Sequence, residues 1–216
     1  MALEKKYAWS VLLRIYHWVM AVSTVFLVVT GFYIHDPWTN TTLVENSSFT
    51  MANMRYIHFL AAQFFACALL IRIYLLFFGN KVERILNFAP LSISNLKRLR
   101  HILYYYGYFS DHYEHPLGHN VLAGIFYCLT FIFGIVVTVS GFYLLYPETQ
   151  FLKSIGIIIF GSPQYARFIH YISMWYFLIF ILVHIYLVIW NSIRHPEGLV
   201  SSIIDGYKFK AEGEGK

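Results

Sequence analysis

The sequence predicts an all-α integral membrane protein that folds as a four-transmembrane-helix bundle. Three observations support this class: a strongly apolar composition, four long apolar runs, and histidines placed inside those runs. Of the 216 residues, 58% are hydrophobic and 12% are charged, whereas about 25% charged residues is usual in soluble domains. This composition excludes a disordered chain, a collagen-like chain and an ordinary water-soluble enzyme.

Each apolar run contains the roughly 20 residues that a helix needs to cross the hydrocarbon core. The chain is expected to form a single domain over 1–216, with spans at about 15–34, 56–78, 121–146 and 168–193. A fifth apolar run, 151–160, is too short to cross and is interpreted as an interfacial helix or loop. The first run is too long for the core of a signal peptide and no cleavage site follows it, so no cleavable leader is expected.

The lysines and arginines predict the orientation of the spans. Outside the spans, twelve of them lie in the N-terminal segment, the 79–120 loop and the tail, and three lie in the other two loops. Because cytoplasmic segments carry the excess of basic residues, both termini and the 79–120 loop are expected to be cytoplasmic. The net charge of +5 then belongs to residues that flank the membrane, and no nucleic-acid partner is expected.

Four histidines lie inside the spans, where an ionisable side chain is costly and usually functional. His170 and His184 are 14 residues apart, which places both on one helix face about 21 Å apart along the axis. His58 matches the depth of His170 near the outer side, and His17 matches His184 near the cytoplasmic side. Two imidazoles per iron form a haem centre suited to electron transfer. The pattern predicts two b-type haems between facing helices, with His17–His184 and His58–His170 as axial ligands.

Four alternatives compete with this interpretation. The four histidines could be independent packing residues, or they could serve a proton-coupled transporter or a haem-free membrane anchor. Their matched depths favour the haem interpretation. A di-metal centre is disfavoured, because the pairs are far apart and no carboxylate lies within a span.

Three arginines are candidate ligands of the haem propionates. Arg72 lies 14 residues after His58, so it shares that helix face at the depth of the inner haem. A buried guanidinium needs an anion, and the spans contain no Asp or Glu. Arg55 and Arg167 each precede an outer histidine by three residues. They could bind the outer propionates or extend to lipid headgroups.

A polar cluster runs from His112 to Asn120 and leads into the third span. Its histidine spacing could suggest zinc, but Pro116 and Gly118 break a shared helical face and no cysteine contributes. His119 and Asn120 are better candidates for binding a quinone, since an amide and an imidazole can donate hydrogen bonds to a carbonyl. Alternatively, Asn120 only caps the third helix.

Motifs along nearly the whole chain are similar to those of one family. They are Arg14-Ile15-Tyr16-His17-Trp18, Arg55-Tyr56-Ile57-His58, Leu99-Arg100-His101-Ile102-Leu103-Tyr104-Tyr105-Tyr106 in the central loop, Gly118-His119-Asn120, Arg167-Phe168-Ile169-His170, His184 and the tail from Glu197 to Tyr207. Together they resemble the b-type cytochrome subunit of membrane-bound nickel–iron hydrogenases. The histidine pattern alone also fits the related formate dehydrogenase cytochrome subunits, and the central loop and tail favour the hydrogenase. Val121 departs from the pattern, which has proline at this position.

The resemblance implies an electron-transfer and quinone-reducing subunit in the bacterial inner membrane, with no catalytic residues of its own. Its partners would be the small iron–sulfur subunit and the large nickel–iron subunit of a hydrogenase, together with membrane lipid. Electrons would pass from the periplasmic hydrogenase to the outer haem, then to the inner haem, and finally to a quinone, expected to be menaquinone.

Overall fold

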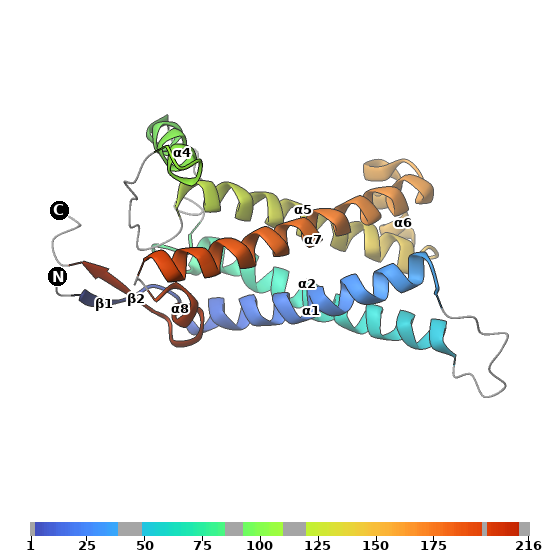
Figure 1. Ribbon diagram of the computed structural model, residues 1–216. Helices are drawn as coiled ribbons and strands as arrows, with labels where there is room; N and C mark the ends of the chain where they lie inside the picture. The colour runs from blue at the N-terminus through green and yellow to red at the C-terminus, as the bar shows by residue number, and fades with distance from the viewer. Residues whose placement is uncertain (1–2, 39–48, 85–92, 110–119, 196–197, 212–216) are drawn as a thin grey trace. The chain divides into compact units, whose positions relative to one another are not determined.

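The computed structural model describes residues 3–38, 49–84, 93–109, 120–195 and 198–211. In chain order, the elements are β1 (Leu3–Tyr7), α1 (Val11–His35), α2 (Thr50–Phe78), α4 (Ile93–Tyr106), α5 (Val121–Leu145), α6 (Gln150–Phe160), α7 (Pro163–Arg194), α8 (Leu199–Asp205) and β2 (Tyr207–Ala211) (Figure 1). The chain divides into two compact units. Unit 1 comprises Met1–Ile15, Ile71–Phe133 and Phe180–Lys216, and unit 2 comprises Tyr16–Leu70 and Gly134–Ile179.

Four helices, α1, α2, α5 and α7, are long and apolar enough to cross a membrane, with 25 to 32 residues each. Each of these helices contains all or nearly all of one of the four predicted spans, so helices are found where the apolar runs predict them. α2 and α7 begin earlier than their apolar runs do. Pro163 opens α7, a position where proline is favoured because its missing N–H would have no partner within the helix.

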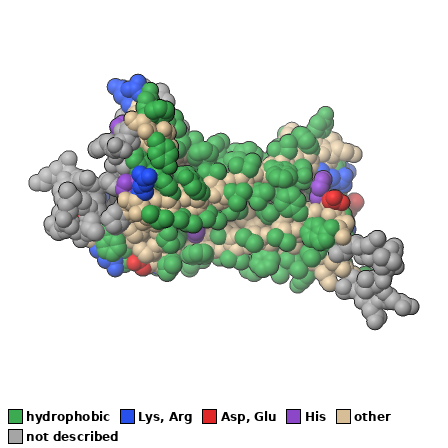
Figure 2. All heavy atoms as spheres, viewed as in Figure 1, with side chains coloured by type: hydrophobic (Ala, Val, Ile, Leu, Met, Phe, Trp, Pro, Cys, Tyr) green, Lys and Arg blue, Asp and Glu red, His purple; other side chains and the backbone are tan. Residues whose placement is uncertain are grey.

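The surfaces of these helices are apolar, as contact with lipid requires. Large hydrophobic side chains such as Phe26 on α1 and Leu182 on α7 are more than half exposed, at 52% and 63%. Figure 2 shows hydrophobic side chains over much of the helical surface in view. An exposed apolar surface of this kind would be unfavourable in water, so these helices suit a multi-pass membrane protein.

In unit 2, the short helix α6 packs against α5. Its Gly156 lies against the ring of Tyr143, where a Cβ atom would come within 2.2 Å of the ring. The Tyr143 and Phe160 rings stack at 6.3 Å between centroids, and Ala166 completes this buried cluster. The run at 151–160 is therefore a helix, one of the two forms expected from the sequence.

Unit 1 contains two elements that the apolar runs do not predict. β1 and β2 form an antiparallel two-stranded sheet with a register from Leu3↔Ala211 to Tyr7↔Tyr207, so the all-α prediction was wrong for the two end segments. Each strand is five residues long. Because the two strands are far apart in the sequence, no local sequence pattern predicts that they pair. In addition, α4 occupies part of the 79–120 segment that was expected to be a loop.

Contacts around the sheet tie both end segments to the start of α1 and the end of α2. Trp9 donates its indole N–H to the Ser202 hydroxyl at 3.1 Å. Glu83 is 2% exposed, and its carboxylate accepts the backbone N–H groups of Ser10 at 2.8 Å and Asn80 at 3.0 Å. We call β1, β2, α8 and these three hydrogen bonds the terminal clasp.

Candidate functional site

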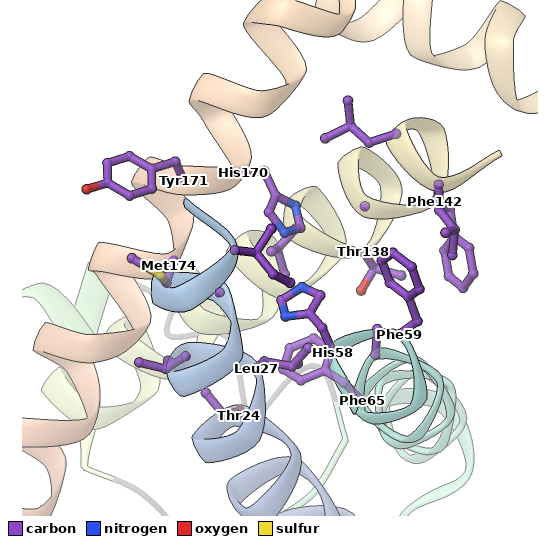
Figure 3. Close-up of a pocket in the computed structure, with 18 of the residues that line it drawn as sticks. Thr24, Leu27, His58, Phe59, Phe65, Thr138, Phe142, His170, Tyr171 and Met174 are labelled. Atoms are coloured by element: carbon purple, nitrogen blue, oxygen red, sulfur yellow. The ribbon is translucent and has the colours of Figure 1, made fainter. Parts of the chain in front are cut away.

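Two of the four histidines face each other in unit 2. His58 on α2 and His170 on α7 point into the same space (Figure 3), with ring centroids 6.4 Å apart and planes inclined by 57°. An iron bonded to one nitrogen of each ring, at about 2 Å, would hold the centroids roughly 6 Å apart. The spacing of this pair therefore fits a single iron between the two rings.

A hydroxyl group holds the Nδ1 nitrogen of each ring. The Nδ1 atom of His58 lies 2.8 Å from the Thr30 hydroxyl, and that of His170 lies 2.9 Å from the Ser140 hydroxyl. Each hydroxyl also donates to a carbonyl of its own helix, at 2.6 Å for Thr30 and 2.8 Å for Ser140. Its oxygen is therefore the acceptor for Nδ1–H, which leaves the Nε2 lone pair of each ring available to a metal.

A cavity of about 740 Å³ surrounds this pair. Its size lies within the roughly 300–1,000 Å³ typical of cofactor and ligand pockets. Leu27, Phe65 and Met174 contribute to its apolar wall (Figure 3). Glycines bring the helix backbone close to both rings: a Cβ on Gly31 would lie 3.6 Å from His58 Cε1, and one on Gly141 would lie 3.2 Å from His170 Cε1.

The cavity also has polar groups at its edge. Arg55 and Arg167 both line it, and both side chains are exposed. The buried hydroxyl of Thr138, which also lines the cavity, has no hydrogen-bond partner among the described residues. Two imidazoles with free Nε2 atoms, an apolar wall and two cations at the edge together fit a haem with its two propionates.

The predicted inner ligands belong to different units. His184 on α7 is in unit 1, where its ring stacks on Phe180 at 5.4 Å and contacts the edge of Tyr127 at 6.0 Å. His17 on α1 is in unit 2, with its ring 5.3 Å from that of Trp18. The pairing of His17 with His184 thus stays a prediction. Arg72 on α2 is 3% exposed, as expected of a guanidinium with a buried role.

Asn120 lies directly before α5 and caps that helix. Its side-chain oxygen accepts the backbone N–H of Ala123 at 2.8 Å, which is the hydrogen bond of a helix N-cap. Its amide nitrogen donates to the Tyr106 hydroxyl at 3.4 Å. The capping role that the sequence left open is therefore present, and the amide group has a second contact beyond it.

His119 and the rest of the 112–119 cluster lie outside the described residues, so the zinc alternative there stays untested. Within the described ranges, no group of three or more His, Cys, Asp or Glu side chains could hold a metal ion. The sequence reasoning did not find Thr30 or Ser140. Hydroxyls in helices usually bond to their own backbone, and only the rotation of each helix brings these two beside a histidine.

Helices long enough and apolar enough to cross a membrane, together with a facing histidine pair, are the features expected of a membrane-bound b-type cytochrome. The family model described as "Prokaryotic cytochrome b561" matches residues 8–206. The chain belongs to this family, and membership implies that it binds haem b.

Several relatives are similar to this chain over most of its length. One from Azotobacter vinelandii is 30% identical over 211 residues, which cover 94% of this chain and 88% of the relative. One from Bradyrhizobium diazoefficiens is 31% identical over 210 residues, covering 93% and 84%. Both are named "Probable Ni/Fe-hydrogenase B-type cytochrome subunit". A third, from Escherichia coli K12, is named "Probable Ni/Fe-hydrogenase 1 B-type cytochrome subunit" and is 24% identical over 211 residues, covering 94% and 90%. The resemblance found in the sequence is confirmed.

Proposed function

We propose that this chain carries electrons from a nickel–iron hydrogenase across the membrane to a quinone. The observation that carries the proposal is the facing pair His58–His170 in a cavity of cofactor size. The names of the relatives support a hydrogenase as the electron donor. The partners would be the small iron–sulfur subunit and the large nickel–iron subunit, and the membrane would be the bacterial inner membrane.

At the outer site, His58 and His170 would bind the iron through Nε2. A haem b held by two imidazoles supplies one-electron transfer and leaves no coordination position open for a substrate. Thr30 and Ser140 keep both rings in the metal-binding tautomer. Arg55 and Arg167 would bind the propionates, because guanidinium groups form bidentate hydrogen bonds with carboxylates.

A second haem would be held by His17 and His184 toward the cytoplasmic side. The 14-residue separation of His170 and His184 on α7 supports two centres on one helix face. Arg72 would bind a propionate of this inner haem. The chain would then form one cytochrome domain with both termini cytoplasmic, and the pairing of β1 with β2 supports termini on the same side.

The quinone, expected to be menaquinone, would bind at the cytoplasmic side near His119 and Asn120. Hydrogen yields two electrons and two protons, and a quinone takes up two electrons and two protons to become the quinol. If the protons for the quinone come from the cytoplasm, each electron that crosses inward stores about 2.3 kcal/mol per 100 mV of membrane potential.

A haem count on the assembled hydrogenase complex tests this proposal. We expect a b-type band in the reduced-minus-oxidised optical spectrum, two haems per chain, and reduction of both by hydrogen without oxygen present. A soluble naphthoquinone should then reoxidise them. A complex without b-type absorbance would instead support a haem-free anchor or transporter, and one haem per chain would contradict the inner pair.

Arg72 gives a second test, directed at the inner haem. Removing one partner of a buried ion pair costs about 3–5 kcal/mol, so Arg72→Leu should reduce retention of the inner haem and leave the outer haem in place. Where the haem is retained, losing a nearby positive charge should lower its midpoint potential. Redox titration of the complex measures both effects, with Arg72→Lys as the charge-preserving control. Unchanged haem content and potential in Arg72→Leu would show that Arg72 has another role.

A further inference from the structure

A hydroxyl group in unit 1 has an unusual set of hydrogen bonds. Tyr106, the last residue of α4, receives an amide N–H from Asn120 at 3.4 Å and another from Asn191 of α7 at 3.2 Å. A phenol oxygen has two lone pairs to accept hydrogen bonds and one proton to donate. Because the two amides occupy the lone pairs, the Tyr106 proton is available to a further acceptor.

Asn191 places a buried acceptor beside this donor. The residue is 9% exposed, and its amide nitrogen donates to Tyr106 and also to the Leu187 carbonyl at 2.8 Å. The Leu187 contact fixes the orientation of the amide, since a flipped group would bring two oxygens together. Its Oδ1 atom is buried and has no hydrogen-bond partner among the described residues. A buried carbonyl left in this state is costly unless a ligand donates to it.

Aromatic rings lie next to this donor and acceptor. The Trp190 ring lies 5.6 Å from the ring of Tyr106 and 5.7 Å from that of Tyr105. Such rings offer flat, apolar faces with a polar group at one end. The ligand that suits this surface is a flat ring whose oxygen accepts a hydrogen bond in one state and donates one in another. A quinone carbonyl, which becomes a hydroxyl on reduction, has this property.

We propose that Tyr106 and Asn191 bind the headgroup of the quinone. The Tyr106 hydroxyl donates to the carbonyl oxygen of the oxidised form, and Asn191 Oδ1 accepts from the hydroxyl of the quinol. The inference rests on the proposed function, because it assigns two residues to the quinone site. Asn120 acts in this arrangement as a positioning residue, since it caps α5 and holds the Tyr106 oxygen.

The test compares single-hydroxyl deletions in the intact hydrogenase complex. Tyr106→Phe removes the proposed donor, and Tyr104→Phe removes a hydroxyl from the same helix on a side chain that is 54% exposed. The measurements are KM and kcat for a soluble naphthoquinone with hydrogen as donor, and the Kd of that quinone for the oxidised complex by calorimetry. Losing one hydrogen bond should raise KM and Kd roughly 3- to 10-fold in Tyr106→Phe. Haem reduction by hydrogen should be unchanged, and Tyr104→Phe should match wild type.

A second variant removes the acceptor. Asn191→Leu keeps the number and branching of the side-chain heavy atoms and should raise KM and Kd by about 10-fold or more, because the Tyr106 hydroxyl also loses one of its two amide donors. If wild type reduces and binds the naphthoquinone but Tyr106→Phe keeps wild-type KM and Kd, the assignment is wrong. A lower melting temperature with unchanged KM and Kd in Tyr106→Phe would show a purely structural role and would also overturn it. If wild type neither binds nor reduces the quinone, the proposed function itself fails. Should Asn191→Leu not assemble, Tyr106→Phe decides alone.

Discussion

Replacing His170 with alanine should leave each chain with about half of its haem and should stop hydrogen-driven reduction of quinone. The change removes one of the two imidazoles that face each other at 6.4 Å. Loss of a residue that hydrogen-bonds to a metal ligand already weakens metal binding by about 10- to 100-fold. Loss of the ligand itself should therefore weaken haem binding further. Because electrons from the hydrogenase would enter at this outer site, the inner haem should also stay oxidised under hydrogen. Haem content and optical spectra under hydrogen measure both effects.

A matched variant separates ligation from ring orientation at the same position. Ser140→Ala keeps the His170 imidazole but removes the hydroxyl that holds its Nδ1 atom at 2.9 Å. This variant should retain the haem, with an affinity about 10- to 100-fold lower than that of wild type. If His170→Ala keeps two haems per chain that hydrogen still reduces, His170 is not an axial ligand.

Replacing His184 with alanine should have a different result, although quinone reduction is lost again. We expect this chain to retain the outer haem, and hydrogen should reduce that haem at the wild-type rate. The reason is that His58, His170 and their hydroxyl partners all belong to unit 2, whereas His184 belongs to unit 1. Stopped-flow spectra with hydrogen, followed by addition of a naphthoquinone, distinguish the two steps.

His101→Ala is the control for this variant, since it removes a histidine of α4 that has no proposed role in binding haem. It should keep both haems and both rates. Loss of the outer haem in His184→Ala, or a full set of two haems, would contradict the pairing of His184 with the inner iron.

The membrane-crossing helices could be predicted from the sequence because span length is a local property of the chain. The depth of each histidine within its span is local too, and depth alone suggested His58 as the partner of His170; the structure brings these two rings together. Ligation itself stays a prediction. Thr30 and Ser140 depend on how each helix is rotated toward its neighbour, which apolar runs do not specify. The hydrogen bonds at Tyr106 likewise join three segments that are far apart in the sequence.

The terminal clasp can form only late in the biosynthesis of the chain. β1 precedes all four long apolar helices in the sequence and its partner β2 follows them, with Leu3 paired to Ala211. The sheet can therefore form only after all four membrane-crossing helices have been synthesised. Closing such a long loop is also entropically costly and slow. Until then, the backbone N–H and C=O groups of β1 have no partner strand. Protection of the β1 amides from hydrogen exchange would therefore mark chains whose insertion is complete.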